Sequence, residues 1–175
     1  MICGKKRGFR VMTVNEKMKL VIDLAKKALE KDELPIACII FFNDTIIAQS
    51  HTSESEDKRL LVHAELKALM ELDQKKVKPK EKMQMELFTN LEPCMMCLGA
   101  AISSFVGKIY YSLDAPSDGA AKWAEKTWHD HHTQSTFCLP VITSGILENE
   151  SRELFKRYID IHKEGPLMEW VKTII

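Results

Sequence analysis

The 175-residue sequence lacks net charge, a long apolar run and an even number of cysteines. Lys and Arg together number 25, as do Asp and Glu, which argues against a protein that binds nucleic acid mainly through a wide basic surface but leaves a local patch open. No stretch approaches a transmembrane span, and residues 1–14 contain no apolar run of signal-peptide length, so we expect no membrane association. Five cysteines disfavour a disulfide framework and favour a metal site in the reducing cytoplasm.

The apolar residues that are present follow helical spacing in some segments and form short continuous runs in others. Thr13 is the expected N-cap of the first helix, with Glu16 completing a capping box. We expect helices over 14–31, 62–75, 94–104 and 147–162, and strands over 35–42, 45–50, 86–90, 108–112 and 141–143. We expect irregular segments over 51–60, 75–82 and 114–137, and a short apolar tail over 167–175. This order predicts a single α/β domain over 13–175, a three-layer α/β/α sandwich with a mixed five-stranded sheet, after a flexible lead-in over 1–12.

Two cysteines three residues apart, Cys94 and Cys97, follow Pro93 and carry the strongest chemical signal. At the start of a predicted helix this spacing places both sulfurs on one face. His63 stands at the start of another predicted helix. Zinc prefers thiolate and imidazole ligands, and a catalytic zinc uses three protein ligands and leaves the fourth position to water. These three residues therefore predict one open Zn²⁺ site per chain.

Glu65 follows His63 by two residues and need not bind the same metal. Its carboxylate can take a proton from an attacking water and deliver it to a leaving amine, which amounts to hydrolytic deamination of an amidine-like ring carbon. The alternatives for the cysteine pair are a structural zinc site in a non-catalytic binding protein, two reduced core thiols, and a thioredoxin-like redox pair. The nearby His63 and Glu65 favour the catalytic interpretation.

With these motifs the chain resembles the cytidine deaminase superfamily, and most closely the branch that contains bacterial tRNA adenosine deaminases and guanine deaminases. The resemblance runs from about Lys17 to His162. It is carried by Leu34–Ala37, Val62–Glu65, Asn90–Ala100, Val106–Tyr111 and Ile142–Leu147. It implies zinc, a deaminase fold, and a homodimer whose interface includes the cysteine helix. Met95, Met96 and Leu98 suit either that interface or the core of the monomer.

The loop before His63 is where the sequence departs from that branch. The branch usually carries an Asn there that holds the base, and by spacing that position is Thr52, preceded by His51. The usual Asp-Pro-Thr-Ala run reads Arg59–Val62. We therefore expect an altered substrate pocket around Thr52 and His51.

The resemblance also implies roles for residues beyond this loop. The backbone N–H groups of Ala64 and Cys94 should face the substrate, and Asp114 aligns with an aspartate that lies near the nucleic acid in the tRNA enzymes. Trp123 and Trp128 belong to a longer, more aromatic segment, where they either stack on a base or anchor the loop on the core.

The identity of the substrate stays open at this level. We place a small nucleobase, nucleoside or related amino-heterocycle first, because zero net charge and the altered loop favour it. The alternative is a wobble adenosine in tRNA, which overall length and segment order favour. A narrow pocket would indicate a small molecule, and an open cleft with basic walls would indicate nucleic acid. The run from His129 to His132 is a solvated loop, part of the pocket mouth or a second metal site.

Overall fold

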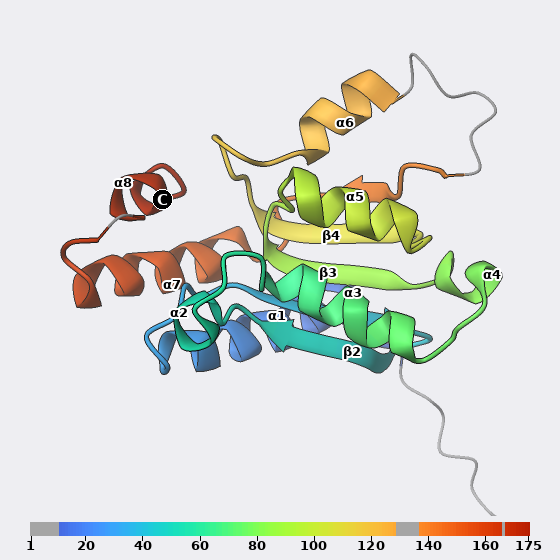
Figure 1. The fold of residues 1–175 in the computed structure, drawn as a ribbon, viewed down its shortest axis with the longest axis horizontal. Coiled ribbons are helices and arrows are strands. Elements are labelled where there is room, and N and C mark those ends of the chain that lie inside the picture. The colour runs from blue at the N-terminus through green and yellow to red at the C-terminus, as the bar shows by residue number, and fades with distance from the viewer. Residues whose placement is uncertain (1–10, 129–136, 166) are drawn as a thin grey trace, which may run out of the picture.

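The computed structural model describes residues 11–128, 137–165 and 167–175, and they are organised around one mixed five-stranded sheet (Figure 1). The strands are β1 (Ala37–Phe42), β2 (Thr45–His51), β3 (Glu86–Leu91), β4 (Lys108–Leu113) and β5 (Val141–Thr143), in the order β2-β1-β3-β4-β5. β1 runs antiparallel to both β2 and β3, whereas β3, β4 and β5 are parallel. The predicted mixed sheet is confirmed.

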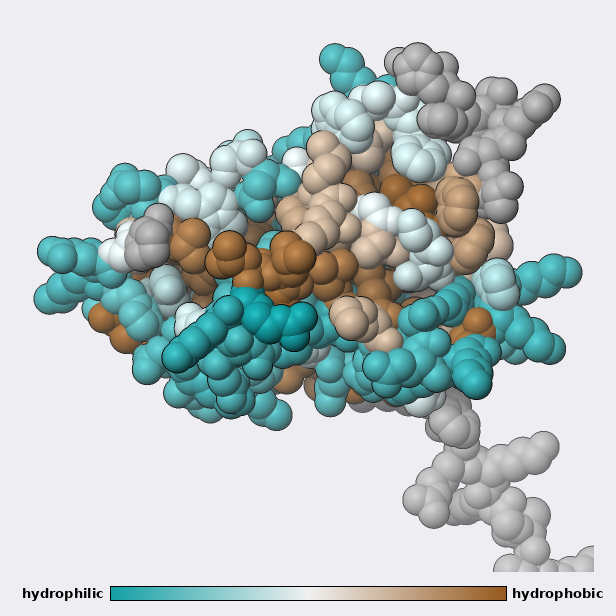
Figure 2. Space-filling view, viewed as in Figure 1, coloured by the Kyte–Doolittle hydropathy of each residue, from teal (hydrophilic) through white to brown (hydrophobic). Residues whose placement is uncertain are grey.

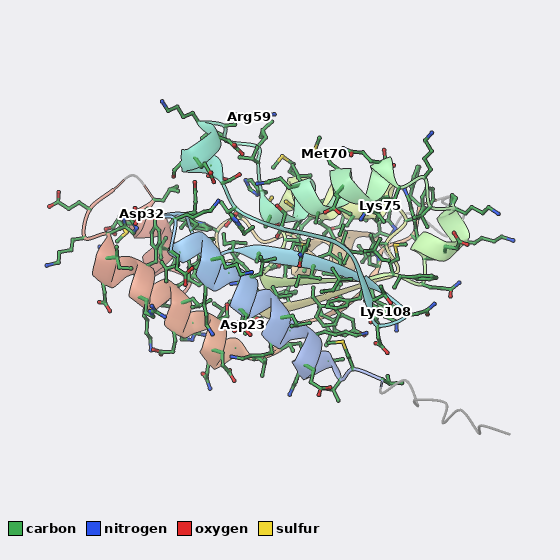
Figure 3. All side chains as sticks on the ribbon, turned by 90° about the horizontal axis from the view of Figure 1, so that it is seen from below. Asp23, Asp32, Arg59, Met70, Lys75 and Lys108 are labelled. Carbon is green, nitrogen blue, oxygen red and sulfur yellow. The ribbon has the colours of Figure 1, made fainter. Side chains whose placement is uncertain are left out.

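Helices cover both faces of this sheet, as the three-layer prediction requires. α1 (Val14–Leu29) and α7 (Glu148–Ile161) lie side by side on one face, which Figure 3 shows from below. α3 (Ala64–Gln74) and α5 (Met95–Ser103) cover the other face. Because neighbouring strand residues point to opposite faces, β1 serves both layers. Ile39 and Phe41 pack in the core beneath α1, while Cys38 and Ile40 pack in the core beneath α3 and α5.

The capping box predicted for the first helix is present. The Thr13 hydroxyl oxygen accepts from the Glu16 N–H at 3.2 Å, and the Glu16 carboxylate accepts from the Thr13 N–H at 2.9 Å. The helix ends at Leu29, two residues earlier than the predicted 14–31, and Asp32 in the turn that follows adopts a positive φ of 60°.

Four short helices occupy segments that we expected to be irregular or, for the last of them, only an apolar tail, and these expectations are corrected. They are α2 (Glu54–Asp57), α4 (Pro79–Lys82), α6 (Ala121–Trp128) and α8 (Met168–Lys172). Helices of one or two turns are marginal by themselves and depend on tertiary contacts, so periodicity does not reveal them. Residues 1–10 of the expected lead-in over 1–12, and the His129–His132 run, lie outside the described residues. Within the described part of the chain, no helix combines the length and apolar character needed to cross a bilayer.

A buried amide ties the sheet together just before the cysteine motif. The side chain of Asn90 accepts from the Ala37 N–H at 2.8 Å and donates to the Pro35 carbonyl at 2.8 Å and to the Ser151 hydroxyl at 3.1 Å. Ser151 in turn donates to the Asn90 carbonyl at 2.8 Å. Because each of these buried polar groups is hydrogen-bonded, the bonds fix the ends of β1, β3 and α7 relative to one another.

Candidate metal centre and active site

Three side chains converge at the ends of β3, α3 and α5. His63 Nδ1 lies 3.7 Å from Cys94 Sγ and 3.6 Å from Cys97 Sγ, and the three ligand atoms all lie within 4.8 Å of one another. A tetrahedral zinc with bonds of about 2.05 Å to nitrogen and about 2.3 Å to sulfur would separate nitrogen and sulfur by about 3.6 Å. The residues therefore fit a zinc ion, and the predicted ligand set is confirmed as one that can hold it.

All three ligands lie at the start of a helix. His63 is the N-cap residue of α3 and Cys94 that of α5, while Cys97 lies in the first turn of α5. The first N–H groups of a helix lack intrahelical acceptors and carry partial positive charge. That environment favours a thiolate over a thiol, which is the form that binds a metal.

Protons are shared unequally among the three ligands of this cluster. The pKa of Cys94 is lowered to about 4, first by the hydrogen bond from Cys97 and, against opposing burial, by His63. The pKa of Cys97 is raised, first because its proton is held by Cys94 and next by burial. The pKa of His63 is raised to about 9, first by its hydrogen bond with Cys94. A metal that needs two thiolates displaces the remaining protons, so its affinity should increase with pH.

Glu65 lies beside the ligands in the first turn of α3 and is buried. One carboxylate oxygen accepts from the Thr89 hydroxyl at 3.2 Å, and the other lies 3.5 Å from Cys97 Sγ. Burial raises the pKa of Glu65, which brings the carboxyl group closer to the range in which it can both accept and release a proton. Thr89, on β3, was not identified from the sequence.

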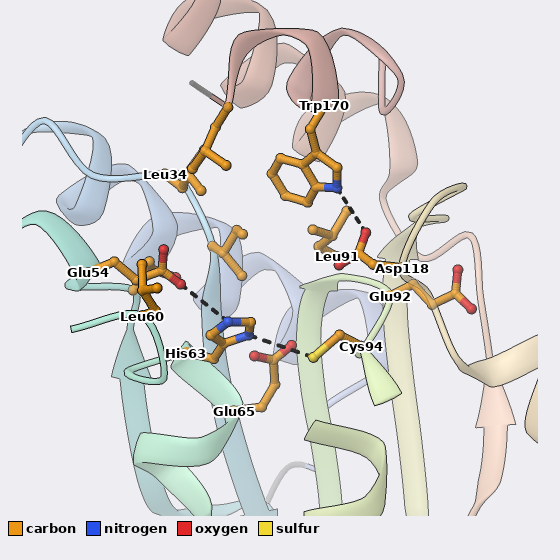
Figure 4. Close-up of a pocket in the computed structure, with 13 residues that line it drawn as sticks. Leu34, Glu54, Leu60, His63, Glu65, Leu91, Glu92, Cys94, Asp118 and Trp170 are labelled. Carbon is orange, nitrogen blue, oxygen red and sulfur yellow. Dashed lines mark hydrogen bonds and ion pairs between the residues drawn. The ribbon is translucent and has the colours of Figure 1, made fainter. Parts of the chain in front are cut away.

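The other ring nitrogen of His63 faces a second carboxylate. His63 Nε2 lies 3.2 Å from Glu54 Oε1, which comes from α2 (Figure 4). Glu54 is half-buried, and it stands in the segment that the sequence predicted to be an irregular loop.

A pocket of about 300 Å³ opens above the metal ligands (Figure 4). This volume is at the lower end of the range for small-molecule sites. Figure 2 shows hydrophobic surface gathered in the area between the positions at which Figure 1 draws α2 and α8. The lining comes from five parts of the chain and comprises Leu34, Ile36, Thr52, Glu54, Leu60, His63, Glu65, Leu91, Glu92, Cys94, Asp118, Leu167 and Trp170. None of these residues is Lys or Arg, and four are acidic.

Two of the residues that we expected to contact the substrate lie at or beside this pocket. Thr52 is buried, lines the pocket, and donates its N–H to the Ile36 carbonyl at 3.0 Å. Ala64 is buried at the first position of α3, between the lining residues His63 and Glu65, but does not itself line the pocket. The predicted roles of both residues in substrate binding remain predictions.

Three other predicted contacts do not line this pocket. His51 hydrogen-bonds the Thr52 carbonyl through Nδ1 at 2.8 Å. Asp114 accepts from the Tyr111 hydroxyl at 3.0 Å and from Lys122 at 2.6 Å, beside a separate polar pocket. Trp123 is 55% exposed on α6. Their proposed roles need a substrate that extends beyond the pocket.

The C-terminal segment supplies a pocket wall that sequence analysis did not anticipate. Leu167 and Trp170 reach the pocket, and the indole N–H of Trp170 donates to Asp118 at 2.8 Å (Figure 4). Asp118 belongs to the loop after β4, and Leu60, 82% exposed, stands at the other side. The segment 167–175 was expected only as an apolar tail, and no local pattern indicates which distant residues it meets.

Glu92 holds the loop after β4 against the cysteine helix. Its carboxylate accepts from the Ala115 N–H at 3.0 Å and from the Ala121 N–H at 2.9 Å. Cys94 pairs with Gly119 in an isolated bridge, and Ala120 donates to the Pro93 carbonyl at 3.0 Å. The Glu-Pro-Cys sequence therefore positions a pocket wall as well as a metal ligand.

The fold and these residues define a class, the cytidine deaminase-like α/β proteins with a zinc-binding His-Cys-Cys cluster. The family model for the cytidine and deoxycytidylate deaminase zinc-binding region matches residues 12–113, and the chain belongs to this family. The resemblance inferred from the sequence is confirmed.

Proteins similar to this chain include tRNA-specific adenosine deaminases and a guanine deaminase. The chain is 30% identical to the tRNA-specific adenosine deaminase of Rickettsia typhi over 81% of its own length and 94% of that protein, and 31% identical to that of Bacillus subtilis over 76% and 80%. A chain from a study of A-to-I editing by tRNA:A34 deaminases aligns at 27% identity with a TM-score of 0.65, over 78% of this chain and 96% of that one. Guanine deaminase from Nitrosomonas europaea aligns at 22% identity with a TM-score of 0.70, over 85% and 86%, which shows the shared fold.

Proposed function

We propose that this protein is a zinc-dependent hydrolytic deaminase that releases ammonia from the amino group of a nucleobase. The observation that carries the proposal is the buried Glu65 carboxylate beside the three metal ligands and at the floor of the pocket. A structural zinc site needs no such group. A carboxylate with a raised pKa at this position suits proton transfer to and from a substrate.

His63, Cys94 and Cys97 would hold the zinc ion, which when bound supplies the Lewis acidity that makes water a competent nucleophile near neutral pH. Glu65 accepts a proton from the attacking water as oxygen bonds to the ring carbon. It then delivers a proton to the amine as the carbon–nitrogen bond breaks, so water is consumed, ammonia leaves and a ring carbonyl remains. Thr89 fixes one Glu65 oxygen during this exchange.

The substrate that the relatives favour is adenosine in tRNA, at the wobble position. Its support is the similarity to tRNA-specific adenosine deaminases over 81% and 76% of this chain, and the likeness to a chain from a study of tRNA:A34 deaminases that act at the wobble position. This support is stronger than that for the small-molecule substrate, which the sequence analysis had placed first. A tRNA enzyme of this type would also act as a homodimer, with exposed Met95 at the start of α5 available to the interface and Leu98 buried in the core.

A free base, nucleoside or related amino-heterocycle is the second candidate, and the pocket lining favours it. Four acidic residues and no Lys or Arg line the pocket, an arrangement that repels phosphate groups. Leu167 and Trp170 further limit its size. These features suit a small neutral or cationic substrate.

One experiment separates the candidates. The zinc-loaded protein is incubated with tRNA anticodon stem-loops that carry A34 and, separately, with a panel of free bases and nucleosides, and ammonia and inosine are measured. Inosine in the RNA without turnover of free purines supports the tRNA substrate, and the reverse result supports the small molecule. Ammonia release that is unchanged by Glu65→Ala would show that the proposed chemistry is wrong.

A further inference from the structure

The imidazole of His63 is held from both sides. Nδ1 faces the two sulfurs, at 3.7 and 3.6 Å, and Nε2 lies 3.2 Å from Glu54 Oε1. A neutral imidazole carries its proton on one nitrogen and offers a lone pair on the other. An acceptor at Nε2 selects the tautomer with the proton there, which leaves the Nδ1 lone pair for the metal.

The short helix that carries Glu54 is fixed from below by a buried carboxylate. Glu33 is 1% exposed and accepts from the backbone N–H groups of Ser55 at 3.2 Å and Glu56 at 2.6 Å. Both N–H groups belong to the first turn of α2, where a helix has no internal acceptors. A buried carboxylate in this role places α2, and with it Glu54, at a defined position over His63.

A second contact fixes Ser53, the residue that directly precedes α2. Lys67, on α3, donates to the Ser53 hydroxyl at 2.6 Å, and Ser53 donates to Asp57 at 2.6 Å. Because Lys67 lies one helical turn beyond His63 on α3, α2 is anchored to the same helix that carries the metal ligand. A helix of four residues has little stability of its own, so these contacts determine where Glu54 points.

We infer that Glu54 is a positioning residue for the metal centre: its carboxylate accepts the Nε2–H of His63, sets the ring orientation and tautomer, and strengthens the Nδ1 donor toward zinc. Carboxylates in this position typically change metal affinity 10- to 100-fold. The inference rests on the metal site of the proposed function and is independent of the substrate. It gives a structural purpose to α2 and to the buried Glu33.

The test is zinc affinity, measured without substrate by competition with a chromophoric chelator. Glu54→Ala should raise the zinc dissociation constant by about 10- to 100-fold. Glu54→Gln keeps an oxygen that accepts from Nε2–H, so it should recover most of the wild-type affinity. The matched control is Glu56→Ala, which removes a carboxylate of the same short helix that pairs with Lys31 rather than with His63. Its affinity should equal that of wild type.

A spectroscopic readout distinguishes positioning from general damage to the fold. In the cobalt(II)-substituted protein, the visible absorption bands should shift in Glu54→Ala and return toward wild type in Glu54→Gln. Wild-type affinity in Glu54→Ala would overturn the inference, and so would an equal loss in Glu56→Ala, which would assign the effect to α2 as a whole. Neither result changes the outcome of the deaminase assay of the wild-type protein, so the role of Glu54 and the proposed deaminase function can be refuted separately.

Discussion

Replacing Gly119 with alanine should displace the carboxylate that holds the loop after β4. A Cβ at this position would overlap the Glu92 carboxylate and lie 2.7 Å from the Ala115 carbonyl oxygen. Glu92 is buried and bonded to the Ala115 and Ala121 N–H groups, so it cannot move without losing at least one of these bonds. Gly119 does not have a positive φ, so the conflict is one of packing alone.

The expected loss in the free energy of unfolding has two contributions, which partly overlap. Overpacking in an interior costs roughly 1–3 kcal/mol, and a hydrogen bond to a charged group contributes roughly 1.5–3 kcal/mol. Because moving Glu92 relieves the overlap while breaking the bond, the two costs are not fully additive, and we expect about 2–4 kcal/mol. For a chain of this size that corresponds to a melting temperature lower by roughly 5–15 °C.

The assay is thermal unfolding of wild type, Gly119→Ala and the matched control Gly99→Ala. Gly99 is an exposed helical glycine with nothing within 4 Å of its Cβ direction, so alanine should be neutral or stabilise by up to about 1 kcal/mol. Glu92→Gln combined with Gly119→Ala should cost less than the sum of the single changes, because both disturb the same contact. A melting temperature of Gly119→Ala equal to that of wild type would refute the assigned role of Glu92.

Further outcomes test the catalytic and structural assignments. Glu65→Gln should lower kcat by about 10²- to 10⁴-fold while zinc content, measured by metal analysis, stays at wild-type level. Trp170→Ala should raise KM for a base-containing substrate by about 5- to 150-fold, because stacking contributes roughly 1–3 kcal/mol, whereas Trp170→Phe should retain most of the affinity. Lys17→Met should destabilise the fold in urea at neutral pH, since Lys17 Nζ lies 2.7 Å from Asp44 and 2.5 Å from Glu86. Burial acts to raise the pKa of Glu86, but Lys17 and, beside it, Lys108 lower this pKa on balance. The stability that the Lys17–Glu86 pair contributes is therefore present above about pH 4.3 and is lost as pH falls through the lower folded pKa, so the effect of Lys17→Met should shrink in acid.

The layered fold was predictable because its signals are local. The continuous apolar run of β1 and the capping box at Thr13 each reflect physics within a few residues. The short helices were not predictable in the same way. α2 depends on Glu33 and Lys67, and nothing in residues 51–60 reveals those contacts.

The sequence by itself determined the metal chemistry. Ligand type, the i, i+3 spacing of Cys94 and Cys97, and the offset between His63 and Glu65 are properties of short segments, and they carry the reaction class with them. Only the tertiary structure decided what surrounds the metal. Glu54, Asp118 and Trp170 come from separate segments, and long-range packing alone brings them together, because pocket walls are assembled by contacts that no local pattern encodes.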